Sequence, residues 1–273
     1  MLARRLSSRF AAARHSRQLV TAPGSKRAAF TPHLELTKHA DRDVQWTAKV
    51  IQRSSLTPSV VGLQLEVQEP CRDDPAVRAR GSLPQQAFSF RCGQWVDFSV
   101  PGLEEVGGYS ICSPPSQLPL LELAVRRAER QPARWVRESA TAGQAVALRV
   151  GGNVWHSVDR DPHRSSRSLV LIGGGIGMSP LMATLREWAA WRLSPDGAAA
   201  SSTLTLLQSA ASEAELVWRD EVTALQAALP DGALGVHYSV TAEADADEGV
   251  AHVLGVLGRE AGVPASRVRF ERW

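Results

Sequence analysis

The sequence has few cysteines and no long apolar run, and both absences exclude classes of protein. Cys71, Cys92 and Cys112 are the three cysteines among 273 residues, and no two of them form a C-x-x-C pair. An odd number without that spacing argues against a disulfide framework and against a structural zinc site. No apolar segment approaches the ~20 residues that a membrane-spanning helix requires. We therefore expect reduced thiols, no metal and no transmembrane segment.

Acidic residues are absent from the first 34 positions, although the whole chain is nearly balanced in charge. The 31 basic and 28 acidic residues give a net charge of +3, and seven of the basic residues lie in positions 1–34. The remaining 24 basic and 28 acidic residues give −4, which argues against a nucleic-acid surface. The leader is rich in Arg, Ser and Ala and places Leu2, Leu6, Phe10 and Ala13 at helical spacing. This composition predicts a mitochondrial presequence and a matrix location, with a disordered basic tail as the alternative.

The first half of the remaining chain is patterned for strands. Trp46, Ala48 and Val50 alternate with polar residues, and the same period of two recurs in further short runs separated by Pro and Gly. Several short strands before any strong helix predict an antiparallel β-barrel over residues 44–160. The expected strands are 44–50, 61–67, 95–100, 109–112, 120–126 and 145–150.

After the proline-containing segment 159–166, expected strands and helices alternate. This alternation predicts an α/β domain with a parallel sheet over residues 166–273. The expected order is strand 168–172, helix 180–192, strand 203–208, helix 213–229, strand 234–240, helix 250–261 and strand 267–271.

The most informative stretch is SLVLIGGGIGMSPL, from Ser168 to Leu181. Its apolar start is typical of a buried parallel strand, and the glycines of the following turn allow positive φ and close approach of a ligand to the backbone. Pro180 fits the first turn of a helix, whose unpaired N–H groups and dipole favour an anion. The stretch predicts a site for the diphosphate of a dinucleotide, with a plain strand-to-helix connection as the alternative. The residues expected to bind it are Gly173, Gly174, Gly175, Ile176, Gly177, Met178, Ser179 and Pro180.

Three motifs together resemble those of ferredoxin reductase-type flavoproteins. The glycine stretch departs from G-x-G-x-x-G, because Met178 stands where the third glycine belongs, and it resembles the family's G-G-x-G-x-x-P turn. Residues 93–102, GQWVDFSVPG, resemble its G-Q-(Y/W)-V…P-G strand, and residues 108–113, GYSICS, resemble its R-x-Y-S motif. The resemblance implies a barrel that holds FAD, an α/β domain that holds NAD(P)H, and transfer of a hydride between them.

The resemblance also assigns flavin roles to individual residues. It implies that Tyr109 packs on the isoalloxazine and hydrogen-bonds the ribityl chain, and that Ser110 lies near flavin N5 with a catalytic hydroxyl. It places Gln94, within the G-Q-W-V motif, among the FAD-binding residues. The alternative for Tyr109 is a plain strand aromatic.

The arginine with which the family neutralises the FAD diphosphate is missing. Gly107 occupies its position, and a bidentate contact of that kind is worth about 1.5–3 kcal/mol. Arg126 or Arg127 on the next strand is the expected replacement, with a solvated strand end as the alternative. Gly151 and Gly152 follow a strand and can offer backbone N–H groups to the second phosphate, with a simple turn as the alternative.

The C-terminal part departs from the family in one respect and resembles it in another. Residues 241–249, TAEADADEG, are too short and acidic for the strand that ends in the family's C-G-P-P-type motif. We therefore expect one missing strand and an incomplete nicotinamide side of the site.

The last residues resemble the terminal strand of plant-type reductases. This implies that Trp273 covers the flavin, with anchoring of the strand as the alternative, and that Glu271 is a candidate proton relay.

The residues after the second strand of the α/β domain bear on cofactor choice. Glu213 and Glu215 lie there, which favours NADH, whereas Arg219 leaves NADPH open. The predicted function is a mitochondrial flavoprotein that oxidises NADH through FAD, and no motif identifies the electron acceptor. The alternative is a non-catalytic nucleotide-binding or scaffold protein, favoured by Gly107 and by the missing strand.

Overall fold

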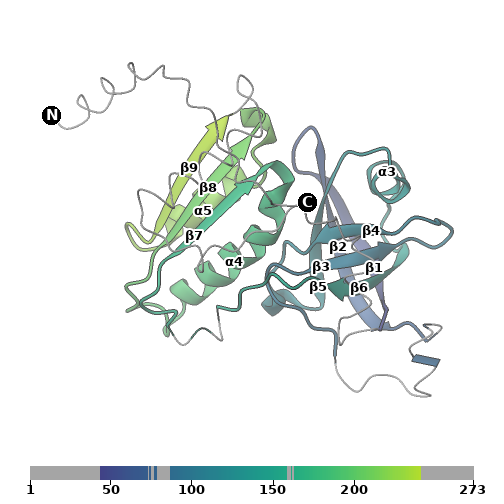
Figure 1. Cartoon of the computed structure of the whole chain (residues 1–273), viewed down its shortest axis with the longest axis horizontal. Coiled ribbons are helices and arrows are strands. Elements are labelled where there is room, and N and C mark those ends of the chain that lie inside the picture. Colours follow the sequence, from purple (N-terminus) through teal and green to yellow (C-terminus); the bar gives the residue numbers. More distant parts are fainter. Residues whose placement is uncertain are drawn as a thin grey trace, which may run out of the picture. The chain divides into compact units, whose positions relative to one another are not determined.

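The structure is a computed structural model that describes residues 44–72, 74, 77–78, 87–158, 161 and 163–240. The described residues form a six-stranded antiparallel sheet followed by a three-stranded parallel sheet, as Figure 1 shows. The predicted order of an all-β domain and an α/β domain is therefore confirmed. The predicted presequence, the acidic segment 241–249, and Glu271 with Trp273 lie outside the described residues.

The antiparallel sheet has the strand order β4-β3-β6-β1-β2-β5. An isolated bridge joins Ile111, directly after β4, to Leu123 of β5, so the first and last strands meet and the sheet closes as the predicted barrel. Alternate side chains point inward and are buried, as a half-exposed pleated strand requires. The elements are β1 (Trp46–Ser55), β2 (Val60–Pro70), β3 (Trp95–Ser99), β4 (Gly107–Ser110), η1 (Pro115–Gln117), β5 (Leu120–Arg126), α3 (Gln131–Glu138) and β6 (Ala145–Gly151).

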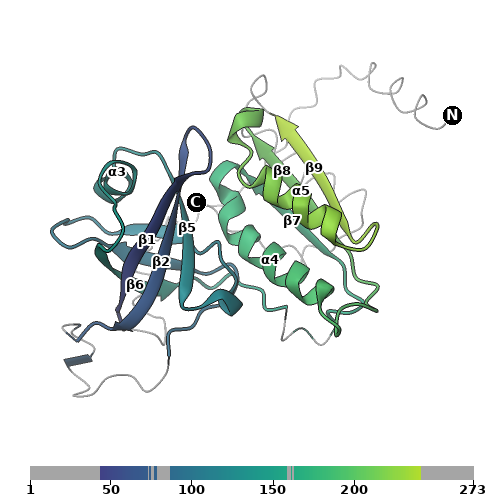
Figure 2. The ribbon, with the colours of Figure 1, turned by 180° about the vertical axis from the view of Figure 1, so that it is seen from behind.

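The parallel sheet has the order β7-β8-β9, and its two crossover connections contain helices. Both α4 and α5 contribute to one apolar cluster with the buried face of this sheet, so they cover the same face (Figure 2). The elements are β7 (Leu169–Gly174), η2 (Gly175–Met178), α4 (Ser179–Leu193), β8 (Leu204–Ala210), η3 (Glu213–Glu215), α5 (Arg219–Ala228) and β9 (Leu234–Val240).

One predicted helix differs from the structure. The segment 213–229 is not a single helix, because Trp218 adopts a left-handed conformation with φ 59° and separates η3 from α5. An α-helix cannot continue through a residue in that region. The other expected elements that fall on described residues are present, with their ends shifted by a few residues.

Candidate functional site

The glycine-rich turn connects β7 to α4 as predicted. Gly175 has φ +49°, which a glycine adopts without strain, and the turn then tightens into the 3-10 helix η2. A β-carbon at Gly175 or Gly177 would meet no other atom within 4 Å, so the space over the turn is open. No side chain caps the start of α4, where Pro180 stands in the first turn. The open turn and the uncapped N–H groups together fit an anionic group such as a phosphate.

Gly173 serves packing rather than access. A β-carbon there would lie 3.0 Å from Leu181 Cδ1 and 3.2 Å from the α-carbon of Met178. The absence of a side chain at Gly173 therefore lets α4 pack closely on β7.

A cavity of about 260 Å³ brings the predicted flavin and dinucleotide residues together. Tyr109 and Ser110 of β4 line it, and so do Ile176 of the glycine-rich turn and Ser179 at the start of α4. Arg126, the predicted phosphate partner at the end of β5, also lines it. Tyr109 and Ser110 thus share one cavity with Ile176 and Ser179, which lie 66–70 positions later in the sequence, as binding of two adjacent cofactor rings requires. The remaining lining residues are Val106, Gly107, Gly108, Ala124, Ala128, Arg130, Pro132 and Ala133.

The ring of Tyr109 occupies the space that a side chain at Gly107 would need. A β-carbon at position 107 would lie 2.6 Å from Tyr109 Cε2, which is shorter than a van der Waals contact. Phe98 packs edge-on against the same ring, with centroids 5.6 Å apart. Burial raises the pKa of the Tyr109 phenol, while Arg130 opposes this shift. Glycine at position 107 is therefore a consequence of how this tyrosine is packed.

Arg126 and Arg130 give one edge of the cavity a positive charge. Neither of them forms an ion pair with any other residue that the structure describes. Arg130 is the N-cap residue of α3 and makes no side-chain capping bond. The N–H of Gln131, in the first turn of this helix, donates instead to the carboxylate of Glu105 at 2.9 Å. The carboxylate of Glu105 therefore lies next to Arg130 at the start of α3.

Arg130 and Glu105 are not among the residues predicted from the sequence. Arg130 follows the predicted strand 120–126 and reaches the cavity because α3 starts there. Three arginines lie between positions 126 and 130, and the sequence alone gives no reason to prefer Arg130 to Arg127 as a phosphate partner. Arg127 does not line the cavity.

Gln94, Gly151 and Gly152 lie at the end of the barrel strands and do not line this cavity. The side-chain amide of Gln94 donates to the carbonyl of Gly152 at 3.0 Å. Gly152 has φ +100°, and a β-carbon there would lie 2.8 Å from Cδ1 of Trp95. These contacts fix the strand ends around Trp95, and an FAD contact from the three residues stays a prediction.

Cys112, two residues after the end of β4, lies beside Ser179. Burial raises the pKa of this thiol to about 12, and the Ser179 hydroxyl partly opposes the shift. The thiol is therefore protonated at neutral pH and is a weak hydrogen-bonding partner. The buried Ser179 hydroxyl has no strong hydrogen-bonding partner among the described residues and remains available to a ligand in the cavity.

Of Glu213 and Glu215, the two acids predicted to favour NADH, Glu215 is hydrogen-bonded to the turn between β1 and β2. The carboxylate of Glu215 accepts hydrogen bonds from Thr57 at 2.8 Å and Ser59 at 2.5 Å, and these bonds lower its pKa. Glu213 is exposed and lies 3.5 Å from Arg219. Glu213 and Arg219 are thus the charged residues near the end of β8 that remain candidates for the choice between NADH and NADPH.

Comparisons with known proteins identify the family. No protein-family model matches the sequence. Oxidoreductase NAD-binding domain-containing protein 1 of Danio rerio is 34% identical over 222 residues, which cover 77% of this chain and 73% of that protein. The chain belongs to the family of oxidoreductase NAD-binding domain-containing protein 1. The Pongo abelii member is 36% identical over 208 residues, which cover 74% of this chain and 61% of that member's length.

Solved structures show the same fold. A ferredoxin-NADP+ reductase from Plasmodium falciparum has a TM-score of 0.59 at 14% identity, with 80% of this chain and 78% of that chain covered. A flavohemoglobin from Malassezia yamatoensis, solved with bound FAD and heme, has a TM-score of 0.62 at 17% identity, with 87% and 63% covered. The predicted resemblance to ferredoxin reductase-type proteins is therefore confirmed in the fold of this member of the oxidoreductase NAD-binding domain-containing protein 1 family.

Neither a cluster of metal ligands nor a helix able to span a membrane occurs within the described ranges. No group of three or more His, Cys, Asp or Glu side chains there is arranged to hold a metal ion. None of the helices described is both long and apolar enough to cross a membrane.

Proposed function

We propose that this protein is a flavoenzyme that oxidises NADH by passing a hydride to FAD. The observation that carries the proposal is the shared cavity, in which Tyr109 and Ser110 face Ile176 and Ser179. A flavin ring held by the first pair and a nicotinamide held by the second would be neighbours. The names of the curated relatives and the likeness to ferredoxin reductases support a redox function.

The residues of the cavity fit a flavin nucleotide. The small or apolar side chains of Ala124, Ala128 and Ala133 leave room for a planar ring, and Tyr109 offers an aromatic neighbour. The diphosphate of FAD would lie at the positive edge formed by Arg126 and Arg130. Bound FAD would supply the chemistry, since its ring accepts the two electrons and the hydrogen that leave the nicotinamide as a hydride.

The glycine-rich turn fits the diphosphate of the nicotinamide dinucleotide. Open space over Gly175 and Gly177 lets phosphate oxygens approach the backbone, and the start of α4 adds uncapped N–H groups. Ser179, at the first position of α4, also lines the flavin cavity. A dinucleotide bound at the turn would therefore extend its nicotinamide end toward Ser110.

The protein's own contribution is to bind and orient two rings and to exclude water between them. Ser110 is 7% exposed, so its hydroxyl acts where competing water is scarce. A tyrosine is neutral at physiological pH, and burial raises the pKa of Tyr109 so that it stays neutral in more alkaline solution as well. A neutral phenol can donate a hydrogen bond to a ribityl oxygen. Positioning of this kind can supply most of the acceleration of a hydride transfer.

We further propose NADH as the preferred donor and the mitochondrial matrix as the location. Glu213 can accept hydrogen bonds from ribose hydroxyls and would repel a 2′-phosphate, although Arg219 lies close enough to moderate that repulsion. Titration with NADH and with NADPH tests the preference, and equal dissociation constants would contradict it.

For the location, a tagged protein without residues 1–34 should stay in the cytosol, and mitochondrial uptake of that variant would contradict the presequence.

An absorption spectrum tests the redox proposal. The purified full-length protein should be yellow after reconstitution with FAD, and NADH should bleach the colour in the absence of oxygen. A protein that binds NADH and does not retain FAD would instead support the alternative of a non-catalytic nucleotide-binding protein.

A further inference from the structure

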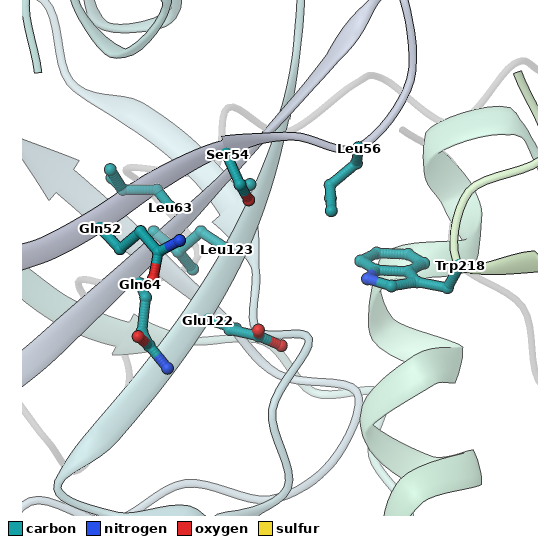
Figure 3. A pocket seen from close by; sticks show the side chains of 9 residues that line it. Gln52, Ser54, Leu56, Leu63, Gln64, Glu122, Leu123 and Trp218 are labelled. Atoms are coloured by element: carbon teal, nitrogen blue, oxygen red, sulfur yellow. The ribbon is translucent and has the colours of Figure 1, made fainter. Parts of the chain in front are cut away.

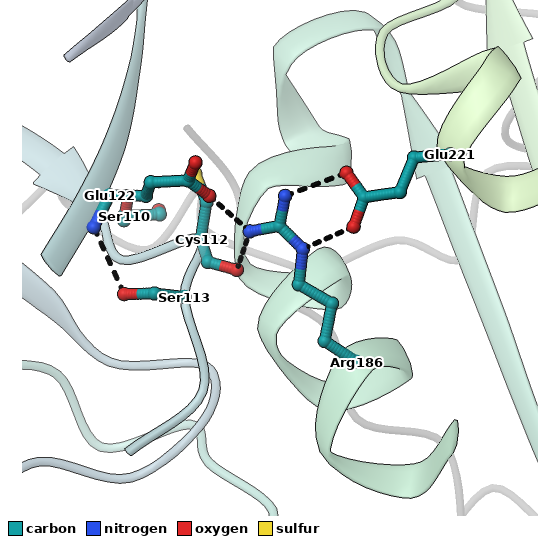
Figure 4. A network of polar contacts seen from close by, with 6 residues as sticks. All are labelled: Ser110, Cys112, Ser113, Glu122, Arg186 and Glu221. Carbon is teal, nitrogen blue, oxygen red and sulfur yellow. Dashed lines mark hydrogen bonds and ion pairs between the residues drawn. The ribbon is translucent and has the colours of Figure 1, made fainter. Parts of the chain in front are cut away.

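Arg186 of α4 joins the barrel to the α/β domain. Its guanidinium makes two bonds to the carboxylate of Glu221 in α5, at 2.6 and 2.7 Å. It also pairs with the carboxylate of Glu122 in β5 and donates to the carbonyl oxygen of Cys112 at 3.1 Å (Figure 4). The side chain is only 11% exposed. Burial by itself would lower its pKa, but the two carboxylates outweigh this effect and keep the guanidinium charged.

The barrel partners of Arg186 adjoin the residues proposed to hold the flavin. Cys112 lies two residues after Ser110, and its N–H donates to the carbonyl of Glu122 at 2.9 Å. The N–H of Glu122 in turn donates to the hydroxyl of Ser113 at 3.0 Å. A shift of Arg186 relative to this segment would therefore move the end of β4.

The same helix is attached to the barrel at a second point. The carboxylate of Glu187 accepts hydrogen bonds from the thiol of Cys92 at 3.3 Å and from the N–H of Val158 at 3.2 Å. Since α4 begins at the glycine-rich turn, these two successive residues connect the proposed dinucleotide site rigidly to the proposed flavin site.

Trp218 supports the arrangement around Arg186. This bulky residue has φ 59°, a conformation that costs free energy and persists only where packing enforces it. Its ring lies 5.9 Å from the Arg186 guanidinium and, with Glu122 and Leu56, lines a cavity of about 160 Å³ (Figure 3). Ile176 and Trp218 both pack on the apolar cluster that contains Cys112.

We propose that Arg186 is a positioning residue that sets the separation between the nicotinamide and flavin sites. This inference rests on the proposed function. Arg186 does not line the shared cavity and lies about 10 Å along α4 from Ser179, at ~1.5 Å per residue, so it acts through the segments that it joins. Hydride transfer depends steeply on the distance between donor and acceptor, and a displacement of about 1 Å can cost about a hundredfold in rate.

The test uses Arg186→Met and Glu122→Gln in the full-length protein reconstituted with FAD. We expect the dissociation constants of FAD and NADH to change by less than about twofold, because neither side chain touches either proposed site. The rate of flavin bleaching by NADH, and the charge-transfer absorbance that reports stacked rings, should fall by about tenfold or more.

The double variant should be no slower than Arg186→Met alone. Arg186→Lys should have an intermediate rate, since lysine keeps the positive charge but lacks the planar set of N–H donors of the guanidinium. Arg72→Met is the control, because Arg72 is exposed and lies 3.7 Å from Glu69.

Wild-type bleaching rates in Arg186→Met and Glu122→Gln would overturn the inference, as would a loss of FAD or NADH affinity that accounts for the slower rate. Hydrogen exchange separates this result from failure of the proposed function. Even if NADH does not bleach the wild-type flavin, Arg186→Met should speed amide exchange in both 109–113 and 217–223. Unchanged exchange in either segment would show that Arg186 does not join them, whatever the reaction.

Discussion

Tyr109 lies over Gly107 so closely that a β-carbon at position 107 would stand 2.6 Å from the tyrosine Cε2. The ring is also held from another side by Phe98. We expect Gly107→Ala to displace the ring and to weaken FAD binding several-fold, because the ring is the proposed aromatic neighbour of the flavin. Quenching of flavin fluorescence measures this. Gly235→Ala is the matched control, since its nearest neighbour would lie at 3.7 Å, and an equal loss in both variants would contradict the role of Tyr109.

Arg130→Gln should reduce the affinity for FAD by about ten- to a hundredfold, which is the worth of a charge-assisted contact to a phosphate. Affinity for riboflavin, which has no phosphate, should be unchanged. Arg134→Gln removes an arginine one helical turn further along α3 that pairs with Glu138 at 3.6 Å, and it serves as the control. Equal losses for FAD and riboflavin would mean that Arg130 supports the fold of the cavity rather than the diphosphate.

Glu105→Gln should have the opposite effect. The Glu105 carboxylate accepts a hydrogen bond from the N–H of Gln131 at the start of α3. In the absence of this carboxylate, the helix dipole would favour a diphosphate at the same place. Removal of this negative charge should tighten FAD binding about two- to fivefold at low ionic strength, with a smaller gain in high salt. Calorimetric titration at two salt concentrations measures both effects, and weaker binding in the variant would contradict the placement of the diphosphate.

Gly175→Asp should abolish NADH binding and leave FAD affinity unchanged, because its carboxylate would repel a diphosphate at the start of α4. Gly175→Asn is the matched control, since both side chains tolerate the φ of +49° and asparagine carries no charge. We expect the asparagine variant to retain most of its NADH affinity. If fluorescence titration shows the same affinity in Gly175→Asp and wild type, the glycine-rich turn does not bind the dinucleotide.

Cys112 should make the protein less stable at high pH. Its pKa is about 12 in the folded state, whereas an unfolded cysteine ionises near 9, so its contribution to stability is complete below about pH 9 and is lost progressively up to about 12. We expect wild type to lose about 1–2 kcal/mol more than Cys112→Ala in free energy of unfolding between pH 8 and 10. Urea denaturation of both proteins measures the difference, and parallel pH profiles would contradict it.

The sequence was sufficient to predict the elements that depend on local pattern. The strand and helix that flank the glycine-rich turn were expected at 168–172 and 180–192 and are found at Leu169–Gly174 and Ser179–Leu193. Apolar runs, glycines and a proline carry that information locally. That the residues around Tyr109 and those of the glycine-rich turn lie close together was implied by the family resemblance, and no sequence spacing indicated it.

Features that depend on tertiary contacts were not predictable. The break before α5 arises at Trp218, a residue type with no preference for positive φ, and packing against the barrel enforces it. Arg186 was one of two arginines on the expected helix 180–192, and its importance depends on Glu122 and Glu221 approaching it from different elements. Arg130 acquires its position from the start of α3, a helix that is not among the elements predicted from the sequence.

The most direct measurement is an anaerobic titration of the FAD-loaded, full-length protein with NADH, followed by absorption. The flavin colour should bleach with close to one equivalent of NADH, and Gly175→Asp, loaded with the same FAD, should keep its colour. A wild-type protein that holds FAD and keeps its full absorption in excess NADH would contradict the proposed oxidation of NADH through FAD.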